Sequence, residues 1–369
     1  MIPFNKPYLT GKETQYIEEA VKSGKISGNG MFTQKCQAYF EKTYGFKKCL
    51  LTTSCTDALE MCAMLANIKE GDEVIIPSFT FVSTAIAFVR QGAKIVFADS
   101  CEDNPNIDAN KIEALITPKT KAIVPVHYAG VACDMDKIMQ LANKYNLIVI
   151  EDAAQAIDSF YKGKPLGSIG HMAAFSFHET KNIIAGEGGM LTINDERFIH
   201  RAEIIWEKGT NRAEFFRGEV NKYGWVDIGS SFLPSEVIAA FLWAQIENLK
   251  EIQNKRLEHW DYYESNLKNW ADNQNIKMIN KTEHTTNNAH MFYLVCESIE
   301  QRSKLIEHLK KEKVLAVFHY ISLHSSPYYK DKHDGRELIN SDKFTDRLLR
   351  LPFFYELQVE SVVEKLLQF

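Results

Sequence analysis

A first candidate for chemistry is the carboxylate of Asp152, which ends an apolar run in the segment LIVIEDAAQ. Such a run is typical of a buried strand, and open α/β sheets bind ligands at the carboxyl ends of their strands. Gln155 follows three residues later, and we expect it one helical turn further on, facing the same cleft. An alternative stays open, because an aspartate here could simply cap a following helix.

A second candidate is Lys181, in the segment SFHETKNIIAGEGGMLTIN. This segment predicts a strand that ends at Phe177, an irregular stretch with the lysine, and a glycine-rich return into another strand. Ser176 and His178 lie on either side of the strand end. A loop lysine is usually a solvated charge, but this position between a strand end and a tight return favours a functional one.

A third candidate is the segment LTTSCTDALE, in which a strand ends near Thr52 and a helix begins at about Cys55–Thr56. The backbone N–H groups and the dipole of a helix start form a site for an anion such as phosphate. Serine and threonine are also ordinary helix caps, so this segment is weak evidence by itself.

Together the three segments match one cofactor, pyridoxal 5′-phosphate (PLP). PLP needs a lysine for its Schiff base, a carboxylate beside its ring nitrogen and an anion site for its phosphate. The carboxylate keeps the ring nitrogen protonated, which allows the ring to accept electrons. A charge-assisted hydrogen bond of this kind contributes roughly 1.5–3 kcal/mol.

The elements that must position these residues alternate along the chain. Apolar runs predict strands at 49–52, 74–76, 95–98, 122–126, 147–150, 173–177 and 188–193, with helical stretches between the first six. This alternation predicts an α/β fold with a mostly parallel sheet. Long helices are expected from Pro234 to about Trp270, and new strands at 291–296 and 314–319 indicate a smaller C-terminal α/β domain. The expected division is 1–245, including an N-terminal arm, and 246–369.

Composition narrows the class of protein. The 369 residues carry a net charge of −5, without the basic excess of a nucleic-acid binder. Seven scattered cysteines without paired spacing are typical of a reducing compartment and exclude an obvious zinc site. The longest uncharged stretch, 74–89, is shorter than the ~20 residues of a membrane helix. We therefore expect a cytoplasmic enzyme with no metal, no nucleic-acid partner and no membrane span.

The chain resembles the DegT/DnrJ/EryC1/StrS sugar aminotransferases over essentially its whole length. The resemblance rests on the motifs SCTDA, PSFTFVST, VPVHYAG, EDAAQ, SFHETK and GEGG, in this order. It implies the type I PLP-dependent fold, that of aspartate aminotransferase. Related dehydratases have a histidine where this chain has Lys181, so the lysine argues against that activity.

The resemblance also implies roles for individual residues. Lys181 would bond to PLP and later move a proton, and Asp152 would pair with the ring nitrogen. The resemblance further implies that Gln155 reaches the ring hydroxyl and that Phe81 covers the ring face. Ser231 stands where many relatives have an asparagine that reaches the phosphate from the partner subunit. The residues implied on the phosphate side are Cys55, Thr56, Ser176 and His178. Alternatives stay open for Phe81, as core packing, and for His178, as a strand-end cap.

On the substrate side, the resemblance points to Lys208 and Arg212 in WEKGTNR and to His319 and Tyr320 in FHYI. Surface charges and a buried structural pair are the respective alternatives. The expected enzyme is a homodimer with shared active sites that transfers the amino group of L-glutamate to a nucleotide-linked keto sugar. The expected acceptor is dTDP-4-dehydro-6-deoxy-D-glucose, giving a 4-amino-4,6-dideoxy-galactose for surface polysaccharide. Amination at the third carbon and a non-catalytic PLP-binding regulator are the alternatives.

Overall fold

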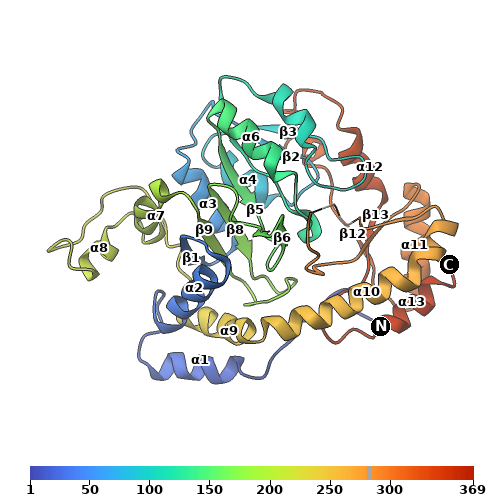
Figure 1. Ribbon diagram of the computed structural model, residues 1–369, viewed down its shortest axis with the longest axis horizontal. Helices are drawn as coiled ribbons and strands as arrows, with labels where there is room; N and C mark the ends of the chain where they lie inside the picture. The colour runs from blue at the N-terminus through green and yellow to red at the C-terminus, as the bar shows by residue number, and fades with distance from the viewer. Residues whose placement is uncertain (281, 283) are drawn as a thin grey trace.

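A computed structural model describes residues 1–280, 282 and 284–369 (Figure 1). Its main feature is a seven-stranded sheet in the order β1-β9-β8-β5-β4-β2-β3. The strands are β1 Lys48–Thr52, β2 Glu73–Pro77, β3 Lys94–Ala98, β4 Thr120–Ile123, β5 Ile148–Asp152, β8 Met172–Ser176 and β9 Gly189–Ile193. Neighbouring strands from β8 to β3 are parallel, and β9 is antiparallel to both β8 and β1. The predicted mostly parallel sheet is confirmed.

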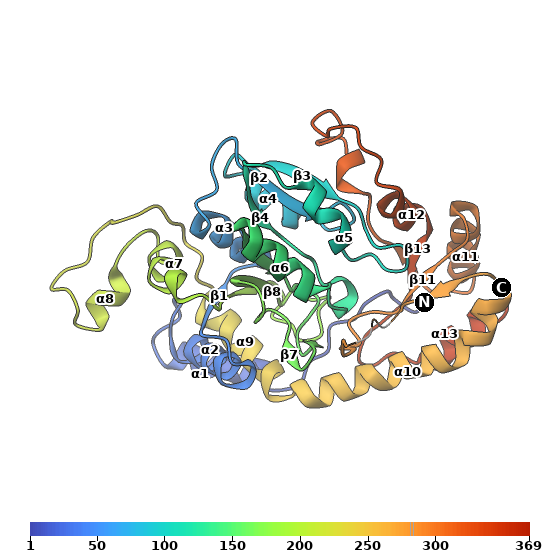
Figure 2. The same ribbon diagram turned by 45° about the horizontal axis from the view of Figure 1, so that its top comes forward.

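Helices cover both faces of this sheet, as the continuous apolar strands require. One face packs against α2 Met31–Tyr44, α5 Ala109–Ile112, α6 Met135–Tyr145 and α9 Glu236–Glu247. The other face packs against α3 Cys55–Leu65, α4 Ser83–Val89 and α7 Ile199–Trp206. Figure 2 shows these two layers with the strands between them. Outside them, α1 Glu13–Lys22 lies beside α9 (Figure 1).

A second, smaller sheet forms the C-terminal part. Its order is β10-β11-β13-β12, all antiparallel, with β10 Lys277–Met278, β11 Tyr293–Val295, β12 Val317–Phe318 and β13 Leu348–Arg350. It shares a core with α10 Leu249–Asn273, α11 Ile299–Lys311, α12 Ile339–Arg347 and α13 Val359–Leu366. The orange-yellow helix α10 runs from the large sheet to this part along one side of the molecule (Figure 1). The expected domain boundary after residue 245 stays a prediction, and it falls within α9.

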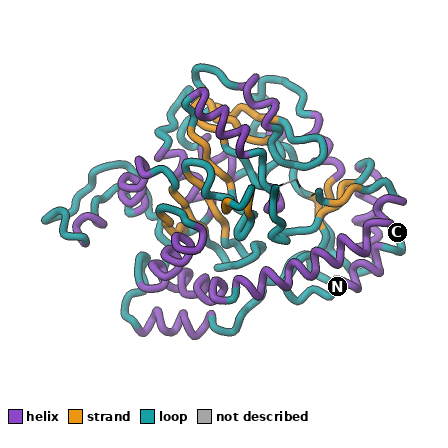
Figure 3. The backbone as a smooth tube through the Cα atoms, in the orientation of Figure 1, coloured by secondary structure: helices purple, strands orange, loops and turns teal. Residues whose placement is uncertain are grey.

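Two peripheral features bear on the site. The N-terminal residue Ile2 pairs with Val314 of the C-terminal part, so the first residues cross from one part to the other. Residues 207–232 form an arm that projects from the body and carries α8 Arg212–Phe216 near its tip (Figures 1 and 3). A small hairpin of β6 Phe160–Tyr161 and β7 Lys164–Pro165 completes the elements. None of the helices among the described residues is long and apolar enough to cross a membrane.

Candidate active site

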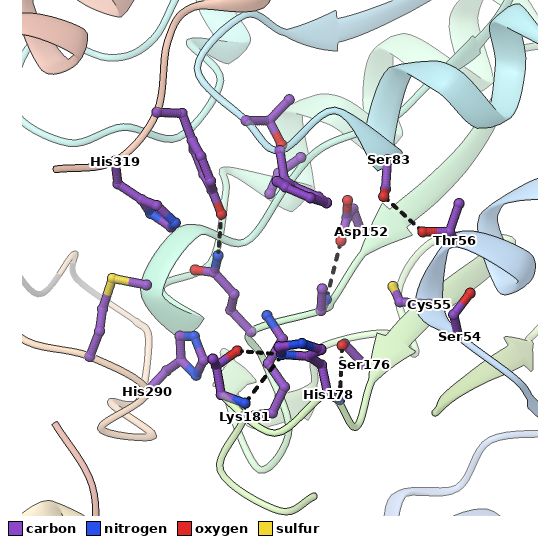
Figure 4. A pocket seen from close by; sticks show the side chains of 18 of the residues that line it. Ser54, Cys55, Thr56, Ser83, Asp152, Ser176, His178, Lys181, His290 and His319 are labelled. Atoms are coloured by element: carbon purple, nitrogen blue, oxygen red, sulfur yellow. Dashed lines mark hydrogen bonds between the residues drawn. The ribbon is translucent and has the colours of Figure 1, made fainter. Parts of the chain in front are cut away.

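The ends of β5 and β8, the start of α3 and the smaller sheet enclose a cavity of about 590 Å³ (Figure 4). Ten of the thirteen residues predicted from the sequence line it. They are Cys55, Thr56, Phe81, Asp152, Gln155, Ser176, His178, Lys181, His319 and Tyr320. The parallel sheet explains the convergence, because parallel strands bring their carboxyl ends to one edge.

Asp152 is the last residue of β5 and is only 5% exposed. Its Oδ2 accepts a hydrogen bond from the hydroxyl of Thr84 at 2.7 Å, and its Oδ1 accepts one from the N–H of Ala154 at 3.2 Å. Burial raises the pKa of Asp152 above its ordinary value, against the opposing effect of these hydrogen bonds. The helix-cap alternative is wrong, because turns rather than a helix follow β5 up to Ser159.

Lys181 lies in the turn between β8 and β9, where its N–H donates to the carbonyl of His178 at 2.9 Å. The turn closes through the pair of hydrogen bonds that Phe177 forms with Gly188 and Ala185. Burial in the cavity lowers the pKa of Lys181, while Cys55 and Asp152 oppose this shift. A lysine with a lowered pKa holds more of its neutral, nucleophilic amine near pH 7.

The start of α3 forms one end of the cavity. Ser54 caps this helix by accepting a hydrogen bond from the N–H of Asp57 at 3.1 Å, and the hydroxyls of Thr56 and Ser83 lie 2.7 Å apart. Ser176, at the end of β8, lines the same cavity. The helix is long enough to present its first N–H groups and its dipole to an anion.

Gly189 of β9 allows the helix start to approach the sheet this closely. A Cβ at this position would lie 2.3 Å from the carbonyl carbon of Ser54 and 2.4 Å from the nitrogen of Cys55. Only glycine therefore permits β9 to pass directly behind the first N–H groups of α3. The glycine-rich return noted in the sequence thus serves the anion site as well as the turn.

Aromatic and amide side chains also line the cavity. Phe81 is 56% exposed, so the alternative that it packs in the core is wrong, and its ring lies 6.0 Å from that of Tyr320. Gln155 accepts a hydrogen bond from the N–H of Ala129 at 2.6 Å and donates to the hydroxyl of Tyr320 at 3.5 Å. The ring of His319 stacks on that of Tyr320 at 3.4 Å, and its Nδ1 lies 2.9 Å from the hydroxyl of Tyr128.

His178 follows the end of β8 and also faces the cavity (Figure 4). Its Nδ1 lies 3.0 Å from the hydroxyl of Thr180, and its backbone N–H donates to the hydroxyl of Ser176 at 3.3 Å. These bonds fit both the cofactor contact and the strand-end cap, so its role stays a prediction.

Three predicted residues, Lys208, Arg212 and Ser231, lie outside the cavity of this single chain. All three are in the projecting arm. The N–H of Lys208 donates to the carbonyl of Ser230 at 3.0 Å, and Ser231 pairs with Glu207. The guanidinium of Arg212 lies 3.9 Å from Glu207 and over the ring of Phe216.

Sequence reasoning missed several residues that line the cavity. The most informative are Arg350 at the end of β13 and His290, whose Nδ1 lies 2.8 Å from the amide oxygen of Asn182. Phe4 and Asn5 also reach the cavity from the N-terminal segment. The one usable signal was the arginine of LRLPFF, a charged residue inside an apolar run.

The cavity fits PLP on its own chemistry. A buried carboxylate, an amine with a lowered pKa and the start of α3 lie around one space, in the arrangement that Figure 4 shows. The carboxylate of Asp152 has two hydrogen bonds and can accept a further one from a protonated ring nitrogen. No group of three or more metal-ligating side chains occurs among the described residues.

Fold and site together define a PLP-dependent enzyme of the type I fold. The chain belongs to the DegT/DnrJ/EryC1/StrS aminotransferase family, whose model matches residues 7–367. It is similar to the spore coat polysaccharide biosynthesis protein SpsC of Bacillus subtilis, with 34% identity over 98% of this chain and 95% of SpsC. It is 32% identical to GDP-perosamine synthase of Escherichia coli O157:H7 over 98% of this chain and 96% of that protein.

Solved structures agree with this assignment. The PLP form of the putative sugar aminotransferase Spr1654 from Streptococcus pneumoniae has a TM-score of 0.89 and 26% identity, covering 100% of this chain and 98% of the other. The form with pyridoxamine phosphate (PMP) has a TM-score of 0.90 at the same identity and coverage. The enzyme is therefore a PLP-dependent nucleotide-sugar aminotransferase.

Proposed function

We propose that this enzyme transfers the amino group of L-glutamate to the fourth carbon of dTDP-4-dehydro-6-deoxy-D-glucose, yielding the 4-amino-4,6-dideoxy-galactose nucleotide. The observation that carries an aminotransferase reaction is the convergence of Lys181, Asp152 and the start of α3 on one cavity. The finer assignment rests on WEKGTNR and AVFHYI, which resemble motifs of dTDP-4-amino-4,6-dideoxygalactose transaminases.

The cavity residues have distinct proposed tasks. When bound, PLP supplies an aldehyde and an electron-accepting ring. Lys181 would hold PLP through its Nζ and would move the proton at the substrate carbon. The carboxylate of Asp152 would hold the proton on the ring nitrogen, and Thr84 keeps this carboxylate in place through its hydroxyl.

Other residues bind and orient. The N–H groups of Cys55 and Thr56, with the hydroxyl of Ser176, would hold the phosphate, and Phe81 would cover one face of the ring. Gln155 would reach the ring hydroxyl while it stays fixed by Ala129. His319 and Tyr320 are proposed to position the sugar, because their stacked rings lie on the side opposite to α3.

We also propose a homodimer in which the arm reaches the cavity of the partner subunit. The arm exposes an apolar set that a monomer would leave in water: Phe216 at 69%, Tyr223 at 50%, Trp225 at 84%, Val226 at 55% and Ile228 at 52%. Contiguous exposed apolar side chains of this kind mark protein contacts. The same arm carries Lys208, Arg212 and Ser231, which this chain does not use in its own cavity. A cytoplasmic location is proposed because all seven cysteines are free thiols.

A panel of substrates tests the reaction. The holoenzyme is incubated with L-glutamate and with 4-keto and 3-keto sugars linked to dTDP, UDP or GDP, and the new amine is located by NMR. We expect amination of the dTDP-linked 4-keto sugar at the fourth carbon. A GDP-linked sugar is the second candidate, because relatives named GDP-perosamine synthase are 32% and 37% identical to this chain. A product aminated only at the third carbon would contradict the proposal.

A further inference from the structure

The cavity contains an arginine that no part of the mechanism above uses. Arg350 ends β13, the inner strand of the smaller sheet, which pairs with β11 on one side and β12 on the other. Phe4 of the N-terminal segment covers one face of the guanidinium, with 4.5 Å from the guanidinium carbon to the ring centre. The side chain is therefore held on a rigid element and points to the cavity.

No hydrogen-bond or ion-pair partner of the Arg350 guanidinium occurs among the residues that the structure describes. Its Nε is buried and has no hydrogen-bond partner in the part of the chain that the structure describes, nor does any described carboxylate form an ion pair with it. Arg256 offers a contrast, since its buried guanidinium donates to the carbonyls of Ala289 at 3.0 Å and His290 at 2.7 Å. Buried charges are costly unless they are paired, so an unpaired arginine in a ligand cavity indicates an anionic ligand.

The position of Arg350 narrows the choice of anion. The cofactor phosphate already has the start of α3, where Ser54, Cys55 and Thr56 lie (Figure 4). Burial lowers the pKa of His290 and of His319, and the positive charge of Arg350, which comes from the smaller sheet, lowers both further. These two histidines lie across the cavity from α3, with Lys181 and Asp152 between them (Figure 4).

Of the two substrates, the amino donor suits this position better. A nucleotide is bulky and carries its phosphates far from the reacting carbon of the sugar, whereas an amino acid carries a small carboxylate within reach of it. The planar fork of an arginine matches a carboxylate with two parallel hydrogen bonds. We infer that Arg350 is the carboxylate-binding residue for the amino donor, a proposal that rests on the amino-acid-to-sugar transfer above.

The test uses the PLP-loaded holoenzyme and the variants Arg350→Gln and Arg350→Lys. Binding of glutarate, an unreactive dicarboxylate, is measured by calorimetry, and KM values are measured for L-glutamate and for the keto sugar. We expect Arg350→Gln to weaken glutarate binding and raise the KM of L-glutamate by roughly 10- to 100-fold, as for the loss of a hydrogen bond to a charged group. The KM of the keto sugar should change less than about threefold, and Arg350→Lys should recover part of the loss.

Arg302→Gln is the matched control. Arg302 also belongs to the smaller domain and also has a buried Nε without a partner among the described residues, but it lies outside the cavity. This variant should bind glutarate as the wild type does. An equal loss in Arg302→Gln, an unchanged glutarate affinity in Arg350→Gln, or a rise in the sugar KM alone would each overturn the inference.

The outcome can be separated from that of the proposed reaction. L-glutamate alone converts the bound PLP to its amine form, and absorbance follows this half of the reaction without any sugar. If the wild type carries out this conversion but aminates no sugar in the panel, the proposed acceptor is wrong and the role of Arg350 is still tested. If Arg350→Gln converts PLP with an unchanged dependence on glutamate concentration, Arg350 does not bind the donor.

Discussion

Replacement of Gly189 by alanine should separate the start of α3 from the sheet and weaken cofactor binding. The new Cβ would lie 2.3 Å from the carbonyl carbon of Ser54, about 1 Å short of an ordinary 3.4 Å contact. Strand β9 cannot retreat, because Gly189 pairs with Thr52 of β1 and with Ser176 of β8. The helix start must therefore move by about 1 Å.

The displacement sets the size of the effect. A hydrogen bond of ~2.9 Å that lengthens by about 1 Å is lost, and a charge-assisted bond contributes roughly 1.5–3 kcal/mol. One lost bond to the phosphate corresponds to about 10- to 150-fold weaker PLP binding. Overpacking should also lower the free energy of unfolding of the apoprotein by about 1–3 kcal/mol.

Two measurements separate these effects. PLP is titrated into the apoprotein while cofactor absorbance is followed, and urea unfolding gives the stability of the apoprotein. Gly45→Ala is the control, because Gly45 ends α2 with φ +72° and no atom within 4 Å of its Cβ position. It should cost about 1–2 kcal/mol of stability and leave the affinity for PLP unchanged. A Gly189→Ala protein with wild-type affinity for PLP would show that the start of α3 does not bind the phosphate.

Three further predictions concern the other parts of the site. Lys181→Ala should lose the visible absorbance of the bound cofactor and all turnover, and an active variant would remove the central assignment. Asp152→Asn should keep its circular dichroism spectrum but lose at least about 100-fold in turnover. Burial raises the pKa of Asp152, so its ionised form destabilises the folded wild type at neutral pH. The Asp152→Asn apoprotein should therefore have a higher free energy of unfolding than the wild type at pH 7. This difference should shrink as the pH falls toward 4, where the wild-type carboxyl becomes protonated. Trp225→Ser should weaken the proposed dimer in light scattering at low concentration, and an active monomeric wild type would exclude a shared site.

Local patterns were enough to predict the sheet and the residues at its edge. The apolar runs around Asp152 and Ser176 are strands, and each chemical residue at their ends lies in the cavity. The observed ends of some elements differ from the expected ones, because tertiary contacts determine where an element ends. The strand expected at 122–126 ends at Ile123, whereas the long helices expected from Pro234 are confirmed as α9 and α10.

The residues that sequence reasoning missed come from segments far from the motifs. His290 and Arg350 are contributed by the C-terminal part of the chain, and Phe4 by the N-terminus. Their positions depend on how the smaller sheet meets the large one, which no local pattern specifies. The arginine in LRLPFF has no strand-end motif around it, so the sequence alone does not distinguish it from a surface charge beside a strand. The only indication of a buried role is that this charge lies within an apolar run.

The cavity contains three buried ionisable groups, Asp152, Lys181 and Arg350, and they respond differently to burial. Burial raises the pKa of Asp152 and lowers the pKa of Lys181. Both groups can therefore lower the free-energy cost of desolvation by becoming neutral. Burial lowers the pKa of Arg350 as well, but a guanidinium still remains protonated near pH 7. The cavity without ligands therefore keeps an uncompensated cation, and an anion bound there stabilises the folded chain in proportion to its saturation. At 100 times its Kd, such a ligand would add about 2.7 kcal/mol. We therefore expect glutarate to raise the Tm of the wild-type holoenzyme and to leave the Tm of the Arg350→Gln holoenzyme unchanged.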